Sequence, residues 1–110
     1  MRSINRVQIL GHVGKVIPLQ KAIKIDVGTN RYWKDDSGEN QTTTDWCTLT
    51  VLDQKTIKFV AANVAKGDSI YAEARVANST YERNGQKVYS TDIIVSLLNR
   101  FDPANNDFSV

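Results

Sequence analysis

Apolar and other residues alternate along most of the chain, which is the period of a β-strand with one buried face. The alternation is clearest over residues 46–52, where Cys47, Leu49 and Val51 point to one side and the residues between them point to the other. Similar stretches predict further strands over residues 4–10, 23–27, 70–81 and 88–98. The chain is therefore expected to be built mainly from strands.

One segment has the period of a helix instead. From Ile57 onwards the apolar residues fall at i, i+3, i+4 and i+7, and Gly67 follows as a natural stop signal. This pattern predicts a single helix over residues 56–66 that packs one apolar stripe against the rest of the fold.

Turn-forming residues separate the expected strands. Gly11 and Gly14 lie close together after the first strand and predict a bend or a bulge. The Asn-Gly pair at 84–85 is a strong signal for a tight hairpin. Residues 34–45 are polar, with a Ser-Gly turn near their centre, so we expect a long, mobile hairpin loop there.

The resulting order of elements is strand, strand, strand, helix, strand, strand, which is the order of the OB-fold. We therefore predict an all-β protein, a five-stranded Greek-key barrel with one helix between strands 3 and 4. A chain of 110 residues has room for one such domain. The domain is expected to span residues 1–99, and a short polar tail without a clear period is expected over residues 100–110.

Composition places the chain among ordinary globular proteins, because 41% of its residues are hydrophobic and 24% are charged. The net charge is only +2, but its distribution is uneven, since residues 1–34 carry seven Lys or Arg side chains and a single acid, Asp26. This asymmetry is compatible with a surface that binds a polyanion, although the default role of a charged side chain is to face solvent.

Several classes of function find no support in the sequence. The only cysteine, Cys47, and the only histidine, His12, form neither a disulfide nor a zinc site, and no nucleophile elbow or phosphate-binding glycine loop is present. We expect no enzyme, no catalytic residue, no cofactor and no metal site. No apolar run approaches the roughly 20 residues that span a bilayer, and the N-terminus lacks the apolar stretch of a signal peptide. A cytoplasmic, nucleoid-associated protein without a membrane partner is expected.

Aromatic residues are placed among polar and basic ones. Trp46 shares a strand face with two threonines, opposite the apolar side. Trp33 lies two residues after Arg31 and directly before Lys34. An exposed ring offers a surface on which an unpaired base stacks, and neighbouring Lys or Arg side chains attract the phosphates. Stacking of this kind is worth roughly 1–3 kcal/mol per base and tolerates any base sequence. The combination indicates a surface for single-stranded nucleic acid.

A second group occupies the strand expected from residue 70 onwards. Tyr71 and Tyr81 share parity with Arg75 there, and Lys87 lies just beyond the following hairpin. Plainer interpretations stay open for all of these residues, because an aromatic ring can belong to the core or to a subunit interface and a cation can simply be solvated. The residues alone give the candidate set Trp33, Trp46, Tyr71, Tyr81, Arg31, Lys34, Arg75 and Lys87.

Five runs of residues, spread between Ile4 and Leu98, carry a family resemblance. They are INRVQILGHVG at 4–14, RYWKDDSG at 31–38, TDW at 44–46, AKGDSIYAEA at 65–74 and GQKVYSTD at 85–92. In this order, and with the helix where an OB barrel places it, the chain resembles the bacterial single-stranded DNA-binding proteins (SSBs).

The resemblance implies an OB barrel that wraps single-stranded DNA (ssDNA) and protects it during replication, recombination and repair. Members of that family commonly assemble as homotetramers, a dimer being the alternative here, and they contact replication and repair proteins. Matched position by position, Trp33, Trp46 and Tyr81 correspond to the family's stacking aromatics, and Asn5-Arg6 corresponds to a basic position near the DNA path.

The chain departs from the family pattern at several places. Leu52 stands where the family often has another stacking phenylalanine, and Cys47 stands where it often has a histidine near the subunit interface. The segment 15–31 is shorter than the family norm. The sequence stops at residues 107–110 without the Gly/Pro-rich linker and the acidic, Pro-Phe-ending tip that the family uses to recruit partner enzymes. We expect either a trimmed chain or a specialised short paralogue.

Two other hypotheses belong to different functional classes. A module resembling primosomal replication protein N, a dimeric OB protein that acts mainly through protein contacts, predicts weaker DNA binding. An OB-fold enzyme domain or oligosaccharide binder is the third class, and strong salt sensitivity of binding would count against a sugar ligand, which releases no counterions. Stacking on aromatic faces does not itself distinguish DNA from RNA.

Overall fold

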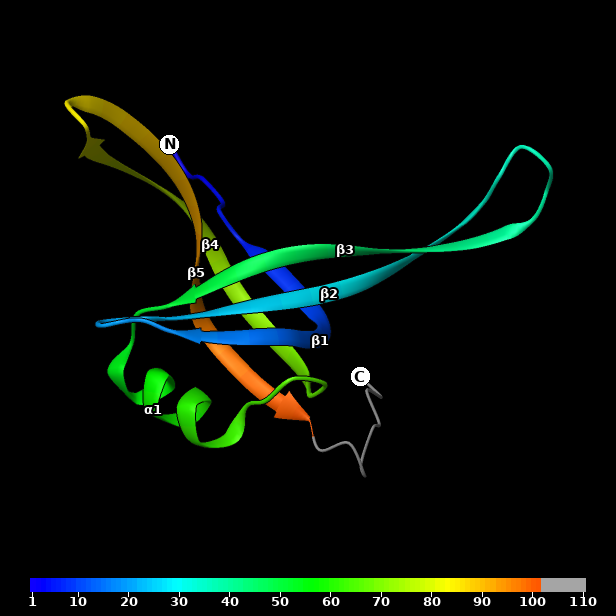
Figure 1. Cartoon of the computed structure of the whole chain (residues 1–110), viewed down its shortest axis with the longest axis horizontal. Coiled ribbons are helices and arrows are strands. Elements are labelled where there is room, and N and C mark those ends of the chain that lie inside the picture. The colour runs from blue at the N-terminus through cyan, green and yellow to red at the C-terminus, as the bar shows by residue number, and fades with distance from the viewer. Residues whose placement is uncertain (102–110) are drawn as a thin grey trace.

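The structure, a computed structural model, describes residues 1–101. Within that range five strands and one helix follow one another in the predicted order (Figure 1). They are β1 Val7–Pro18, β2 Ile23–Lys34, β3 Asn40–Val51, α1 Gln54–Asn63, β4 Ser69–Arg83 and β5 Gln86–Phe101.

The strands close into a barrel in the order β1-β2-β3-β5-β4, and β4 pairs with β1 to complete it. All neighbouring strands are antiparallel except β3 and β5, whose parallel pairing is limited to Leu49 with Ile93 and Thr50 with Ile94. Two long hairpins, β2–β3 and β4–β5, extend from the barrel in different directions, and α1 lies beneath it (Figure 1). This confirms the predicted all-β barrel with one helix between strands 3 and 4.

The barrel core follows from the period-two pattern. Ile25 and Val27 of β2 and Leu49 of β3 are fully buried, and they face one another across the interior with buried residues of the other strands. The helix contributes Val60, which is also fully buried, so α1 closes the apolar interior at one end. Each such aliphatic side chain contributes about 1.5–3 kcal/mol when it leaves water. The alternation read from the sequence is therefore what drives closure of the barrel.

The helix is displaced from its predicted bounds, 56–66, and the prediction was wrong at both ends. It begins earlier because Asp53 caps it, accepting a hydrogen bond from the backbone N–H of Thr56 at 3.1 Å and another from the Thr56 hydroxyl at 2.9 Å. These bonds also lower the pKa of Asp53, the hydroxyl foremost. It ends earlier because Val64 adopts an extended conformation, with φ −106° and ψ 127°, and is buried.

The long loop expected over residues 34–45 is mostly strand, so that prediction was wrong. β2 and β3 stay paired along their full lengths, and only residues 35–39 connect them. Asp35 organises this connection, because its carboxylate accepts hydrogen bonds from the Ser37 hydroxyl and from the backbone N–H groups of Ser37 and Glu39. The same bonds, the Ser37 hydroxyl foremost, hold the pKa of Asp35 below its ordinary value.

The first strand is shifted along the chain. β1 begins at Val7 rather than at Ile4, whose side chain is 93% exposed, and it continues through the glycine-containing segment to Pro18. The pairing of β1 with β2 shifts register between Val13 and Lys15, in the region where Gly11 and Gly14 predicted a bend or a bulge.

The last strand continues past the expected domain boundary at residue 99. β5 runs to Phe101, where it pairs with Ser69 at the start of β4, so the expected tail begins inside a strand. The remainder of that tail, residues 102–110, lies outside the described residues.

The connection between α1 and β4 is fastened to β1 at the bulge. The backbone N–H of Gly67 donates to the carbonyl of Val13 at 2.8 Å, and the N–H of Val13 donates to the carbonyl of Asp68 at 2.8 Å. The buried Asp68 carboxylate accepts from the N–H of Ala65 at 2.9 Å and from Nε of Arg100 at 3.1 Å. These partners, the Ala65 N–H foremost, lower the pKa of Asp68.

Candidate nucleic-acid interface

Most of the candidate residues belong to the strand pairs β2–β3 and β4–β5, whose hairpins leave the barrel in different directions (Figure 1). The β2–β3 hairpin carries Trp33 and Trp46, with Arg31 and Lys34 beside the first of them. The β4–β5 hairpin carries Tyr81 with the second set of candidates. The two groups that the sequence pattern distinguished therefore lie on different hairpins.

Trp46 lies where the β2–β3 hairpin meets the barrel wall. Its side chain is 57% exposed. The six-membered ring covers Gly14 so closely that a Cβ atom at that position would lie 2.8 Å from the ring atom Cη2. His12 approaches the ring edge-on, with ring centroids 5.5 Å apart and planes at 78°. The indole therefore rests on glycine backbone while keeping a large surface open to solvent, as a stacking platform requires.

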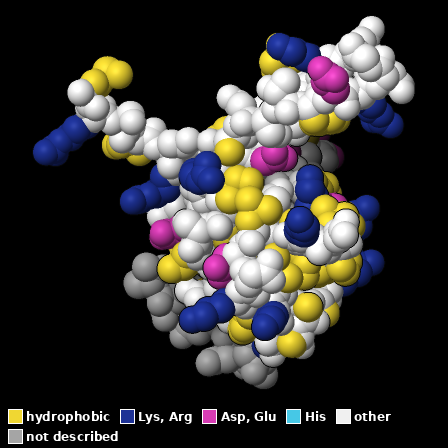
Figure 2. Space-filling model, turned by 90° about the vertical axis from the view of Figure 1, so that its left-hand side faces the viewer, with side chains coloured by type: hydrophobic (Ala, Val, Ile, Leu, Met, Phe, Trp, Pro, Cys, Tyr) yellow, Lys and Arg dark blue, Asp and Glu magenta, His cyan; other side chains and the backbone are white. Residues whose placement is uncertain are grey.

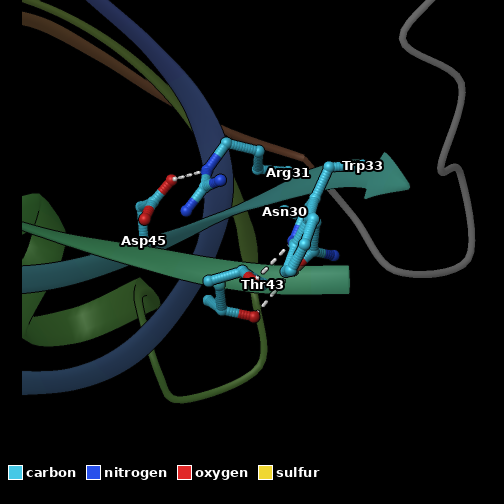
Figure 3. Close-up of polar contacts among 6 residues, drawn as sticks. Asn30, Arg31, Trp33, Thr43 and Asp45 are labelled. Carbon is cyan, nitrogen blue, oxygen red and sulfur yellow. Dashed lines mark hydrogen bonds and ion pairs between the residues drawn. The ribbon is translucent and has the colours of Figure 1, made fainter. Parts of the chain in front are cut away.

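Trp33 is held by its hairpin neighbour. Its indole Nε1 donates a hydrogen bond to the Thr43 hydroxyl at 2.9 Å, and 43% of its side chain is exposed (Figure 3). On the same ribbon, Nε of Arg31 pairs with a carboxylate oxygen of Asp45 at 3.1 Å, both side chains being more than half exposed (Figure 3). An exposed pair of this kind contributes about 0–1 kcal/mol, so the guanidinium remains free to exchange its partner for a phosphate at little cost.

The strand register divides the two tryptophans between the two faces of the hairpin. Trp46 pairs with Gly28 of β2, so it lies on the same face as Gly28. Trp33 lies an odd number of positions after Gly28 on the same strand. Because neighbouring residues of a strand point to opposite faces, Trp33 and Trp46 lie on opposite faces of the hairpin. The face of Trp46 continues instead through Tyr32 to Lys34. Tyr32 is 76% exposed. Counting parity across the hairpin would have found it, but the expectation of a loop at 34–45 removed the register on which that count depends.

The β4–β5 hairpin carries Tyr71, Arg75 and Tyr81 on one face, in agreement with their parity in the sequence. Tyr81 is 48% exposed near the end of this hairpin. Tyr71 is half-buried, and its hydroxyl donates to Glu73 at 2.6 Å while accepting from the Gln8 amide at 3.1 Å. The Glu73 carboxylate chiefly raises the pKa of Tyr71. Tyr81 is thus the more available ring of the two.

Three further candidates take different places. Lys87 pairs with Glu82 on the face of the β4–β5 hairpin opposite Tyr81. The Asn5 amide is occupied, because it donates to the Val76 carbonyl at 2.8 Å and accepts from the Val76 N–H at 2.9 Å, which fastens the N-terminal segment to β4. Arg6 is exposed just before β1, near enough to Tyr71 to influence its pKa.

On one face of the molecule, positive charge is distributed rather than gathered into a single patch. Figure 2 shows Lys and Arg side chains spread over one face of the molecule, with Asp and Glu side chains between them. Among residues 1–101, no group of three or more His, Cys, Asp and Glu side chains is arranged to hold a metal ion. The same range contains no helix of the length and apolarity needed to cross a membrane.

Sequence comparison decides the family. The model of the single-strand binding protein family matches residues 4–101, which is nearly all of the chain. The chain belongs to this family. Its SSB relatives include single-stranded DNA-binding protein 1 of Chlorobaculum tepidum, 28% identical over 101 residues. That match covers 84% of this chain and 62% of the relative, so the chain spans less than two thirds of the length of that relative.

Solved SSB structures have the same fold. The SSB of Plasmodium falciparum, solved in complex with ssDNA, superposes with a TM-score of 0.74 at 25% identity, covering 93% of this chain and 98% of that one. A small single-stranded DNA-binding protein of Streptomyces coelicolor superposes with a TM-score of 0.60 at 20% identity, covering 94% and 98% of the two chains. At that identity the second likeness shows the fold alone.

Proposed function

We propose that this SSB family protein binds ssDNA without sequence preference, by stacking bases on exposed rings and by pairing phosphates with Lys and Arg. The observation that carries the proposal is Trp46, an indole more than half exposed on the wall of an SSB barrel and supported from behind by glycine. An exposed tryptophan forgoes the free energy that burying its large apolar surface would give, and stacking with a base recovers part of that free energy. The likeness to the Plasmodium falciparum SSB, solved with ssDNA, supports the same ligand.

The proposed stacking residues are Trp46, Trp33 and Tyr81, with Tyr32 added from the register of the β2–β3 hairpin. The proposed phosphate contacts are Arg31, Lys34, Arg75, Lys87 and Arg6. Tyr71 and Asn5 are engaged in bonds within the chain, so we propose supporting roles for them. The protein acts as a binding protein and not as an enzyme, protecting ssDNA in replication, recombination and repair near the nucleoid, in contact with proteins of those processes.

We also propose assembly from several copies, a homotetramer with a dimer as the alternative. Large apolar side chains lie exposed on the outside of the barrel, where monomeric proteins seldom leave them together. Leu10 of β1 is 44% exposed and pairs with Tyr71 of β4, while Leu97 of β5 is 43% exposed and pairs with Glu73 of β4. Sedimentation of the chain at several concentrations distinguishes these assemblies from a monomer.

The test of ssDNA binding is a titration of tryptophan fluorescence with oligo-dT and with a duplex of matched length, each at two salt concentrations. Binding by stacking and phosphate pairing quenches the fluorescence with oligo-dT alone, and added salt weakens the affinity because phosphate pairing releases counterions. An unchanged spectrum with oligo-dT overturns the proposal.

One observation favours the accessory module that acts mainly through protein contacts. Leu52, directly after β3, is 50% exposed and presents an aliphatic side chain where the family often has a stacking ring. An aliphatic side chain offers no π-face to a base, so this position adds less affinity. Weak oligo-dT binding together with a dimer in sedimentation would favour that module over ssDNA protection.

A further inference from the structure

We propose that Lys15 and Lys66 form a phosphate clamp beside Trp46, which holds the backbone of the nucleotide whose base stacks on that ring. The inference rests on the proposed function, because it names two residues of the same site. Neither lysine belongs to the candidate set that the sequence pattern gave.

The two lysines border an open hollow beside Trp46. The hollow has a volume of about 330 Å³ and is lined by Gly14, Lys15, Asp26, Trp46 and Lys66. This volume lies at the lower end of the range for small-ligand pockets. The indole is part of its lining, so the sugar and phosphate of a base stacked on Trp46 would lie near the two lysines that share this lining. The lining residues come from β1, β2, β3 and the α1–β4 connection.

Backbone hydrogen bonds bring Lys66 to this place. The α1–β4 connection is tied to the β1 bulge by the bond from the Gly67 N–H to the Val13 carbonyl at 2.8 Å and by the return bond from the Val13 N–H to Asp68 at 2.8 Å. Lys66 directly precedes Gly67 in the sequence, and Lys15 directly follows Gly14 at the bulge. Their position is thus a product of the fold rather than of two mobile side chains meeting by chance.

The charges of the hollow favour an anion. Both lysines are exposed, and within residues 1–101 neither is joined to a carboxylate by an ion pair. The one acidic residue in the lining, Asp26, accepts a hydrogen bond from the Thr48 hydroxyl at 2.6 Å. Two ammonium groups against one carboxylate leave the hollow with one uncompensated positive charge, which a phosphate diester would neutralise.

The absence of a side chain at Gly14 keeps the clamp and the ring together. A Cβ atom there would lie 2.8 Å from Cη2 of Trp46 and closer still to its neighbour Cζ3, which no real contact allows. Glycine therefore lets the indole settle against the bulge from which Lys15 projects. The ring and the two charges form one unit built on that close approach.

The experiment compares Lys15→Gln, Lys66→Gln and the double variant with the unmodified chain in oligo-dT titrations over a series of salt concentrations. The slope of log K against log salt is negative, and each lost phosphate contact reduces its magnitude by about 0.7 for a single strand. The double variant should reduce it by about 1.4. The quenching at saturation should stay at the wild-type level, because the ring itself is unchanged. Lys58→Gln, at an exposed position of α1 outside the hollow, is the matched control and should keep the wild-type slope.

Slopes of Lys15→Gln and Lys66→Gln equal to that of the wild type would overturn the clamp, as would an equal loss in Lys58→Gln. Failure of the clamp is distinct from failure of the proposed function. In the first case the wild-type chain still binds oligo-dT with quenching, and in the second it does not bind at all. Thermal unfolding of each variant verifies that these substitutions of exposed side chains leave the fold intact.

Discussion

Trp33 and Trp46 occupy opposite faces of the same two-stranded hairpin, although both lie in motifs that suggest one function. Trp46 faces outward from the barrel wall with Tyr32 and Lys34 on its side. Trp33 shares its face with Thr43, to which it is hydrogen-bonded. A strand of DNA that touches both indoles has to pass around an edge of the hairpin, whereas one that touches Trp46 and Tyr32 can follow a single face.

This geometry predicts that the contribution of Trp33 depends on the length of the DNA. Trp46→Ala should weaken binding of both short and long oligo-dT by roughly 5- to 150-fold, the equivalent of about 1–3 kcal/mol for a lost stacked base. Trp33→Ala should weaken the binding of only the longer oligomers. An OB-fold holds ~4–16 nucleotides, and an oligomer near the lower end of this range is too short to contact both faces of the hairpin. Equilibrium titrations monitored by fluorescence anisotropy of labelled oligo-dT measure both. Equal losses at every length would contradict the two-face arrangement.

Tyr32 should contribute to affinity although no sequence motif singled it out. Tyr32 lies four positions along β2 from Gly28, the partner of Trp46, which is about 13 Å of strand at ~3.3 Å per residue, and the even spacing puts it on the Trp46 face. Tyr32→Ala should weaken oligo-dT binding by several fold. Tyr89→Ala is the matched control, since Tyr89 is 77% exposed, against 76% for Tyr32, but lies on the β4–β5 hairpin on the face opposite Tyr81. A larger loss for Tyr89→Ala than for Tyr32→Ala would refute this assignment.

Gly14→Ala should disturb Trp46 more than it disturbs the fold. The added methyl group overlaps the indole, so the ring must leave the bulge and with it the edge-on contact to His12. In a Trp33→Phe background, where Trp46 is the remaining tryptophan, the emission maximum of the free protein should shift and the quenching by oligo-dT should fall. An unchanged emission spectrum would show that the ring does not rest on Gly14.

Asp68 should make the stability of the fold depend on pH in the acid range. Its pKa is lowered in the folded chain, first by the Ala65 N–H and then by Arg100, so the unfolded chain takes up a proton more readily than the folded one. The stabilisation is therefore complete above the ordinary Asp pKa of about 3.9 and is lost as the pH falls through the lower folded value. Asp68→Asn should cost roughly 1–3 kcal/mol at neutral pH, and its difference from the wild type should narrow in acid.

Urea unfolding at a series of pH values measures this difference. Asp36→Asn is the control, because Asp36 is exposed in the connection between β2 and β3 and forms no hydrogen bond or ion pair recorded for residues 1–101. It should follow the wild-type profile at every pH. A constant gap between Asp68→Asn and the wild type across the acid range would contradict the assignment.

The barrel could be predicted from the sequence because its strands have one face in the core. Ile23, Ile25 and Val27 alternate with polar residues for that reason, and they define β2 inside the barrel. From Thr29 to Lys34 the same strand has no buried residue, so alternation disappears and the segment that follows resembles a loop. Hydrogen bonds between paired strands hold this part together, and they leave no periodic trace in composition.

The site was predictable to the extent that a residue broke the local pattern. Trp46 did so, because an indole on the polar side of an otherwise regular strand is conspicuous. Tyr32 did not, since its face follows only from the register of the hairpin. Lys15 and Lys66 are separated by about half of the chain, and only the hydrogen bonds around Val13 bring them to one hollow. Contacts of this kind depend on the tertiary structure alone.

The part of the β2–β3 hairpin that extends beyond the barrel gives the protein a surface whose length does not depend on its core. Because Thr29 to Lys34 contribute nothing to the buried interior, residues could be added to or removed from both strands without opening the barrel. The pleat restricts such changes to even steps. One extra residue in each strand beyond Gly28 and Trp46 would carry Tyr32 and Lys34 to the other side, whereas two would lengthen the track and keep its order.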